Sequence, residues 1–290
     1  HTGGGAASPT QQAMLVAGYA YTHVIAQQMS PKRQVIVHLS LMGLAVLTSL
    51  PFGLREAWLQ SQSDPALWLL AALLVSIGLP LFVVSSSAPL FQHWFGFTDH
   101  PDAEDPYYLY AASNVGSMLA LFGYPFFVER FFPVGQQATM WAFGFGLLVA
   151  LTAGCGAFIF GRDVHRSEAP QAEAAEPLTW KRRGWWLLIT FIPSSLMLGV
   201  THFLTTDLAS VPLLWVLPLG LYLLSFILVF ARLPRLDSFY RVVLPPATLL
   251  VLAATYTHSL GTPLLVAAHV TLFFLFAMYF HGRLADDRPH

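Results

Sequence analysis

The chain has 290 residues, of which 56% are hydrophobic and only 10% are charged, and its formal net charge is −1. Soluble domains average about 45–50% apolar and about 25% charged residues, so this composition excludes an ordinary water-soluble domain. The small net charge gives no electrostatic basis for binding nucleic acid. The single cysteine, Cys155, excludes an intrachain disulfide and a thiolate metal cluster, and its apolar surroundings predict that it packs in the core.

Long stretches without Asp, Glu, Lys or Arg cover most of the chain: 65–98, 106–128, 131–161, 184–206, 208–231 and 242–282. A membrane span needs about 20 mostly apolar residues to cross about 30 Å of hydrocarbon. The pattern therefore predicts an all-α fold, a polytopic membrane bundle of about nine transmembrane helices. The apolar runs put these helices near 11–28, 34–53, 66–88, 107–128, 136–160, 184–203, 209–231, 240–257 and 263–281.

Three predicted helices begin with a capping side chain followed by proline, at Asp64-Pro65, Asp105-Pro106 and Thr262-Pro263. Proline is favoured at the first helical position because its missing N–H would have no partner there. We therefore expect helices to start at these dipeptides, with the preceding Asp or Thr as the cap.

The basic residues predict the orientation, because positive residues gather in cytoplasmic loops. Twelve of the fourteen Lys and Arg residues lie in loops after odd-numbered spans, and only Arg55 and Arg130 lie after even-numbered spans. We therefore expect residue 290 to be cytoplasmic and the first visible span to begin outside. The opening HTGGGAASPT lacks the basic flank and apolar stretch of a signal peptide, and we expect a preceding helix to be missing.

A hydrophilic linker at 161–183 separates two predicted membrane bundles, 1–160 with about five helices and 184–290 with about four. Two bundles joined by a cytoplasmic loop are typical of two-half transporters. The same arrangement also joins bundles that transport nothing. Kinked helices are predicted by prolines inside apolar segments, at 193, 212, 218, 245 and 246. Such kinks occur both in transporters and in membrane bundles that transport nothing.

The stretch 85–108 is unusual because it is assigned to the cytoplasm and contains no Lys or Arg. We expect Ser85, Ser86 and Ser87 to end a span, and a loop to follow. This loop carries an acidic cluster of Asp99, Asp102, Glu104 and Asp105. The cluster would attract a cationic amine or a basic soluble partner; the alternative is a solvated loop with a helix cap.

Two further groups of polar residues fall in or beside predicted spans. Ser113 and Asn114, with Gly116 and Ser117, form a small polar helix face that favours close helix packing, with ligand binding as the alternative. Asp207 is the only charged residue between 184 and 231 and follows Thr205 and Thr206. It is a candidate cation contact, or simply the cap of the seventh span.

The remaining chemistry is sparse. His23, His38, His202 and His269 have no metal-ligand spacing, so we expect each to form interhelical hydrogen bonds. No phosphate-binding glycine-rich loop and no His-Glu-x-x-His helix is present, and we predict no metal, no cofactor and no catalytic residue in this chain.

Three strings resemble the membrane portion of bacterial fused MFS/spermidine-synthase-like proteins: QAMLVAGYAYTH (12–23), SSSAPLFQHWFGFTDHPDAEDPYYLYAASNVGSMLALFGYPF (85–126) and PSSLMLGVTHFLTTDLASVPLLWVLPLGLYLLSFILVFAR (193–232). The resemblance extends to HGRLADDRP (281–289). Glu129-Arg130 stands where the family resemblance leads us to expect Glu-Pro.

The resemblance implies an MFS-like bundle in a bacterial inner (plasma) membrane, followed in the family by more membrane segments and a cytoplasmic aminopropyltransferase-like domain. We expect that synthase-like domain to be missing from this chain, so no catalytic residue is transferred and the chain itself is not expected to be an enzyme. The implied function is transport of a polyamine or other small cation. The alternative is a non-transporting membrane anchor for the synthase-like domain.

Overall fold

In the computed structural model, the described residues are 3–49, 71, 74–101, 103, 108–161, 179–208, 213–231 and 237–287, and every regular element among them is helical. The elements in chain order are α1 (Gly3–Gln28), α2 (Pro31–Ser49), η2 (Leu74–Gly78), α4 (Leu79–Phe95), α5 (Tyr108–Gly123), η3 (Tyr124–Val128), α6 (Glu129–Phe131), α7 (Val134–Phe160), α8 (Trp180–His202), η4 (Phe203–Leu208), α9 (Val216–Phe230), α10 (Asp237–Thr257) and α11 (Thr262–Asp286). The η elements are π-helical. The predicted all-α class is confirmed for these residues.

Several helices have the length and surface of membrane spans. Five in the described part are long and apolar enough: Tyr108–Phe131, Val134–Phe160, Trp180–Thr206, Asp237–Thr257 and Thr262–Asp286. Large apolar side chains on them point outward, and Leu147 at the middle of α7 is 61% exposed. A soluble protein rarely exposes such continuous apolar surface, so these helices fit a multi-pass membrane protein. The count of nine spans stays a prediction.

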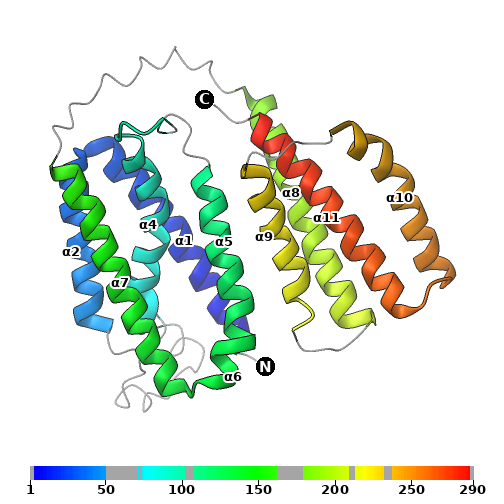
Figure 1. Cartoon of the computed structure of the whole chain (residues 1–290), viewed down its shortest axis with the longest axis horizontal. Helices are drawn as coiled ribbons and strands as arrows, with labels where there is room; N and C mark the ends of the chain where they lie inside the picture. The colour runs from blue at the N-terminus through cyan, green and yellow to red at the C-terminus, as the bar shows by residue number, and fades with distance from the viewer. Residues whose placement is uncertain are drawn as a thin grey trace. The chain divides into compact units, whose positions relative to one another are not determined.

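The helices pack into two compact units (Figure 1). The first contains α1, α2, η2, α4 and α7, and the second contains α5, α8, η4, α9, α10 and α11. The predicted division at the linker assigned 107–128 to the first bundle, whereas the structure packs α5 against α9. Most of the linker, 162–178, lies outside the described residues.

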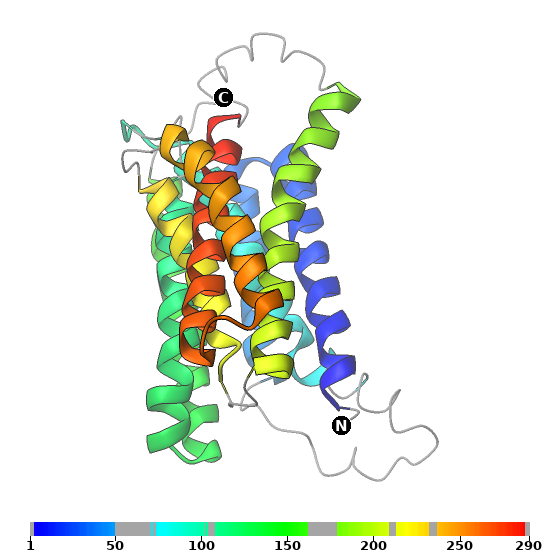
Figure 2. The same cartoon turned by 90° about the vertical axis from the view of Figure 1, so that its right-hand side faces the viewer.

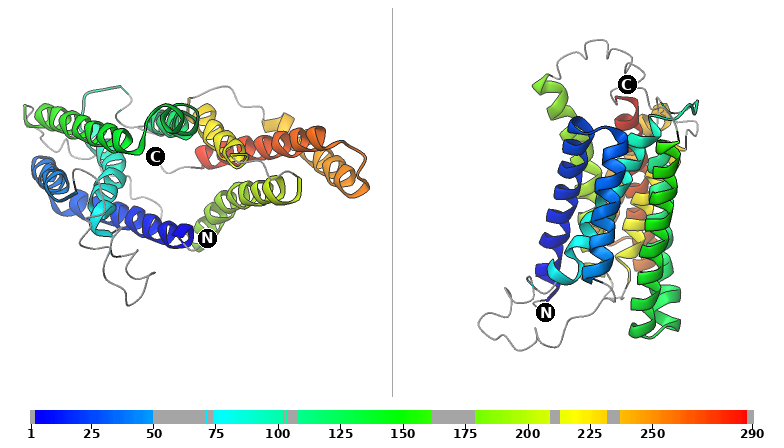
Figure 3. Two further views of the ribbon diagram at one scale, coloured as in Figure 1. Left: turned by 90° about the horizontal axis from the view of Figure 1, so that it is seen from below. Right: turned by 90° about the vertical axis from the view of Figure 1, so that its left-hand side faces the viewer.

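In the first unit, α4 packs against α1 and α2, and α7 also packs against α2 (Figure 3). Its buried core includes Val35, Leu90, Trp94 and Ile159. Two glycines let the helices approach closely: a Cβ at Gly18 would lie 2.6 Å from Ser85 Oγ, and a Cβ at Gly156 would overlap the Val35 side chain. Small residues at such contacts are a common device of helix packing in membranes.

In the second unit, α11 contacts α8, α9 and α10, and α5 covers α9 (Figure 2). Phe273 and Ala277 of α11 are buried at the centre. A Cβ at Gly220 of α9 would lie 2.6 Å from Phe122 Cζ of α5, so this glycine makes room for the ring. Packing of α11 on α8, α9 and α10, and of α5 on α9, therefore holds the unit together.

The structure corrects the expected end of the third span. We predicted that the three serines close it and that a loop runs from 85 to 108, but α4 continues to Phe95. Each serine hydroxyl donates to a carbonyl one turn earlier, for example Ser87 Oγ to Val83 O at 2.7 Å. The hydroxyls are thereby satisfied inside the helix, which continues because Leu90 and Trp94 are buried.

Other expectations about local structure had mixed outcomes. Cys155 is exposed on α7, so the prediction that it fills the core was wrong. The predicted start of a helix at Thr262-Pro263 is confirmed, but the cap is Gly261 and no side chain caps the helix. Pro193 lies inside α8, and Pro245 and Pro246 lie inside α10. Asp64-Pro65 and Asp105-Pro106 lie outside the described residues.

Candidate functional site

A buried polar cluster joins three helices of the first unit. His38 of α2 is buried, and its Nε2 lies 3.1 Å from Ser87 Oγ of α4. The hydroxyl of Tyr21 in α1 lies 3.5 Å from His38 Nδ1, and the two rings are stacked at 6.0 Å between centroids. Apolar helices thus enclose an imidazole, a phenol and a hydroxyl that contact one another.

The contacts of Ser87 determine which nitrogen of His38 carries the proton. The Val83 carbonyl can only accept a hydrogen bond, so the Ser87 hydroxyl donates to it. His38 Nε2 must then donate to Ser87 Oγ, which leaves His38 Nδ1 as the acceptor that faces the Tyr21 hydroxyl. In a neutral imidazole this arrangement uses both ring nitrogens.

Two further interhelical hydrogen bonds surround this cluster. Trp94 Nε1 of α4 donates to Gln34 Oε1 of α2 at 2.9 Å, and Thr22 Oγ1 of α1 donates to Ser86 O at 3.2 Å. All four of these residues are buried. Such bonds between apolar helices are worth about 0.6–2 kcal/mol each, so they fix how the helices sit against one another.

The second unit contains a similar buried pair. His281 of α11 is buried, and its Nδ1 lies 2.8 Å from Ser225 Oγ of α9. The Ser225 hydroxyl donates to Tyr222 O at 2.6 Å, so His281 Nδ1 donates to Ser225 Oγ. His281 Nε2 is then an acceptor, and it has no hydrogen-bond partner among the described residues.

Aromatic rings and one more hydroxyl pair enclose His281. Phe226 stacks on the imidazole at 3.8 Å between centroids, and Tyr222 meets it edge-on at 4.8 Å. The Tyr222 hydroxyl lies 3.1 Å from Ser194 Oγ of α8. The polar groups of this unit therefore connect α8, α9 and α11.

Neither His–Ser pair is arranged as a nucleophile with its base. A base must accept the hydroxyl proton, whereas both imidazoles donate to the serine and both serines donate to a backbone carbonyl. The pairs can hold helices together and can offer hydrogen bonds to a polar solute.

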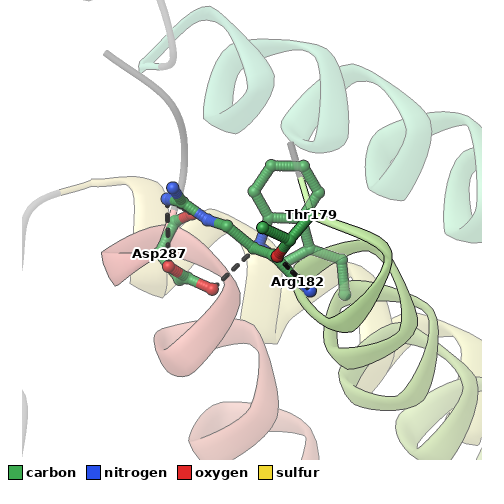
Figure 4. Close-up of polar contacts among 4 residues, drawn as sticks. Thr179, Arg182 and Asp287 are labelled. Carbon is green, nitrogen blue, oxygen red and sulfur yellow. Dashed lines mark hydrogen bonds and ion pairs between the residues drawn. The ribbon is translucent and has the colours of Figure 1, made fainter. Parts of the chain in front are cut away.

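The ends of α8 and α11 are joined by a polar contact at the helix surface (Figure 4). Arg182 Nη2 lies 3.2 Å from Asp287 Oδ1, and Trp186 Nε1 donates to Asp287 Oδ2 at 2.8 Å. Thr179 caps α8 by accepting from the Arg182 backbone N–H at 3.3 Å. Both oxygens of the carboxylate are thus used in tying α11 to the first turns of α8.

The predicted residues around Asp207 lie on a π-helical segment. Thr205 Oγ1 donates to Thr201 O at 2.8 Å, and Thr206 Oγ1 lies 3.5 Å from His202 Nδ1. Asp207 belongs to η4, which continues α8. The cap residue of α9 is Trp215. The alternative that Asp207 caps the seventh predicted span, 209–231, stays a prediction, because residues 209–212 lie outside the described part of the chain.

Among the described residues, no described contact joins the other predicted site residues to η4. Asp99 is exposed after the end of α4, whereas Asp102, Glu104 and Asp105 lie outside the described residues. Asn114 Nδ2 donates to Tyr110 O within α5 at 2.7 Å, and Ser113 O accepts from Ser117 Oγ within the same helix. Their predicted roles in binding stay predictions.

Two of the four histidines expected to form interhelical hydrogen bonds contact a neighbouring helix in the structure. His38 bonds across to α4, and His269 Nε2 of α11 lies 3.4 Å from Thr255 Oγ1 of α10, so both predictions are confirmed. His23 bonds Gln27 within α1, and His202 contacts Thr206 one turn away, so among the described residues neither of these two histidines shows the expected interhelical bond. Sequence reasoning missed His281 because its partner Ser225 is 56 residues away and no local pattern links them.

Comparison with known proteins gave no relatives. No protein-family model matches the chain. Searches of curated proteins and of solved structures also found no match.

Proposed function

We propose that this chain is the membrane region of a fused MFS/spermidine-synthase-like protein and that it transports a polyamine or another small cation. The support for membrane placement is the exposed apolar surface of helices long enough to cross a bilayer. The support for transport is the presence of two helical units, each with a polar cluster enclosed by apolar helices. Movement of two units against each other is the usual basis of alternating access.

In this proposal the cation meets acidic residues on both sides of the membrane. Asp207, with Thr205 and Thr206 beside it, attracts the amine from outside, and the acidic cluster at 99–105 attracts it on the cytoplasmic side. Coulomb attraction between exposed unit charges is about 1 kcal/mol at 4 Å in water-like surroundings. Shape and hydrogen bonding must therefore supply most of the selectivity.

Uptake by reconstituted protein tests this proposal. Vesicles containing the protein are expected to accumulate labelled putrescine or spermidine above empty vesicles, and Asp207→Asn is expected to lower initial uptake about fivefold by removing about 1 kcal/mol of attraction. Asp237→Asn at the start of α10 is the matched control, since it removes the same charge elsewhere and should leave uptake unchanged.

The second candidate function is a membrane anchor for an aminopropyltransferase-like domain. The anchor function is favoured by the contact of Asp287 with Arg182 and Trp186, because this contact fixes the end of α11 against α8. Uptake no greater than that of empty vesicles, from protein that keeps its helical circular dichroism, would refute the transport proposal and favour the anchor.

A further inference from the structure

The first two turns of α8 have the sequence WKRRGWW (180–186), and the structure separates its basic and indole side chains into two faces. Arg182 and Trp186 turn toward α11 and bind Asp287. These two residues are one turn apart, so they share a helix face. The remaining four, Trp180, Lys181, Arg183 and Trp185, are exposed, and we call them the basic–indole surface.

The basic–indole surface is positively charged. Asp287 uses both carboxylate oxygens on the inward face, so it neutralises Arg182 rather than Lys181 or Arg183. The Arg183 guanidinium lies 5.0 Å above the Trp180 ring, while Trp180 is 84% exposed and Trp185 is 41% exposed. Large indoles on a soluble surface are costly, so their exposure indicates a partner that is apolar on one side and polar on the other.

Immediately after this surface, α8 becomes apolar on the outside. Leu187 is 71% exposed, Leu188 is 48% exposed and Phe191 is 66% exposed. With a rise of about 1.5 Å per residue, the guanidinium-bearing residue 183 is about 6 Å along the helix axis from residue 187. A separation of this size places basic side chains at the lipid headgroups when the leucines begin to enter the hydrocarbon. Tryptophan is enriched at that boundary.

We propose that the basic–indole surface binds the headgroups of anionic phospholipids in the leaflet at this end of α8. Lys181 and Arg183 donate hydrogen bonds to the phosphate oxygens. Trp180, whose ring lies under the Arg183 guanidinium, stays at headgroup level, and Trp185, nearer to Leu187, lies at the ester level with its ring against the first methylenes. Each basic side chain near an anionic bilayer contributes attraction, whereas the same indoles would sit equally well in a neutral leaflet. This inference depends on the membrane placement proposed above.

Quenching of tryptophan fluorescence by brominated lipids tests the inference on the full chain. The protein is reconstituted into equal mixtures of phosphatidylglycerol and phosphatidylcholine in which one lipid or the other has brominated acyl chains. We expect stronger quenching when phosphatidylglycerol carries the bromine. Lys181→Gln with Arg183→Gln should lower this preference about fivefold for each charge removed, and Trp180→Phe with Trp185→Phe should remove the difference between the two lipids.

The control variant is Lys32→Gln with Arg33→Gln, which removes the same charge at the start of α2. It should leave the phosphatidylglycerol preference unchanged, and 0.5 M salt should weaken the preference in the wild type because screening is then strong. Equal quenching by the two brominated lipids in the wild type, or an equal loss in the control variant, would overturn the headgroup site. Absence of quenching by either lipid would overturn the membrane placement itself.

Discussion

Gly156→Leu in α7 is expected to lower the free energy of unfolding by about 3 kcal/mol. A Cβ at this position would overlap the Val35 side chain of α2, and Val35 is itself buried in the core of the first unit. The larger side chain must therefore push α7 away from α2, which removes the packing that joins these helices. Denaturation with SDS in mixed micelles, followed by circular dichroism, measures the change.

Gly154→Leu is the matched control on the same helix. Nothing lies within 4 Å of a Cβ built at Gly154, and the residue is exposed, so we expect a change within about 0.5 kcal/mol. Val35→Ala should restore part of the stability lost in Gly156→Leu, since it removes the atoms that the new side chain meets. Equal losses in the two leucine variants would show that α7 does not pack on α2 through Gly156.

His38→Ala is expected to lower the free energy of unfolding by about 2 kcal/mol. The substitution removes the hydrogen bond to Ser87 and the ring that lies between Tyr21 and Trp94, 6.0 Å and 6.4 Å from their centroids. It also leaves the Tyr21 hydroxyl without the imidazole acceptor. The same SDS titration measures the loss.

His23→Ala provides the comparison. His23 is exposed on α1 and bonds Gln27 one turn away, so its loss should cost less than about 0.5 kcal/mol. If both alanine variants lose the same stability, the buried cluster does not hold α1, α2 and α4 together.

The helical class and most helix positions could be predicted from the sequence because apolar runs are directly visible in it. Predicted and observed limits agree within a few residues for α7 (Val134–Phe160) and α10 (Asp237–Thr257). The end of α4 could not be predicted by hydropathy, since hydroxyls that bond their own helix make three serines compatible with its interior.

The candidate site was harder to predict because it depends on contacts between distant segments. The chain order of α5 gave no indication that it packs on α9, where Gly220 receives the Phe122 ring. Likewise, the pairs His38–Ser87 and His281–Ser225 are 49 and 56 residues apart. A single sequence contains no periodic signal at such separations, so only the folded chain reveals these pairs.

Cysteine accessibility in intact vesicles tests the membrane placement most directly. In a Cys155→Ser background, Leu147→Cys puts a thiol at the middle of α7 on a side chain that is 61% exposed, and Glu129→Cys puts one on the exposed turn before that helix. A membrane-impermeant maleimide should label Glu129→Cys and leave Leu147→Cys unlabelled until detergent and denaturant are added, because lipid covers residue 147. Labelling of Leu147→Cys as fast as Glu129→Cys in folded protein would show that water surrounds α7 and would contradict the account.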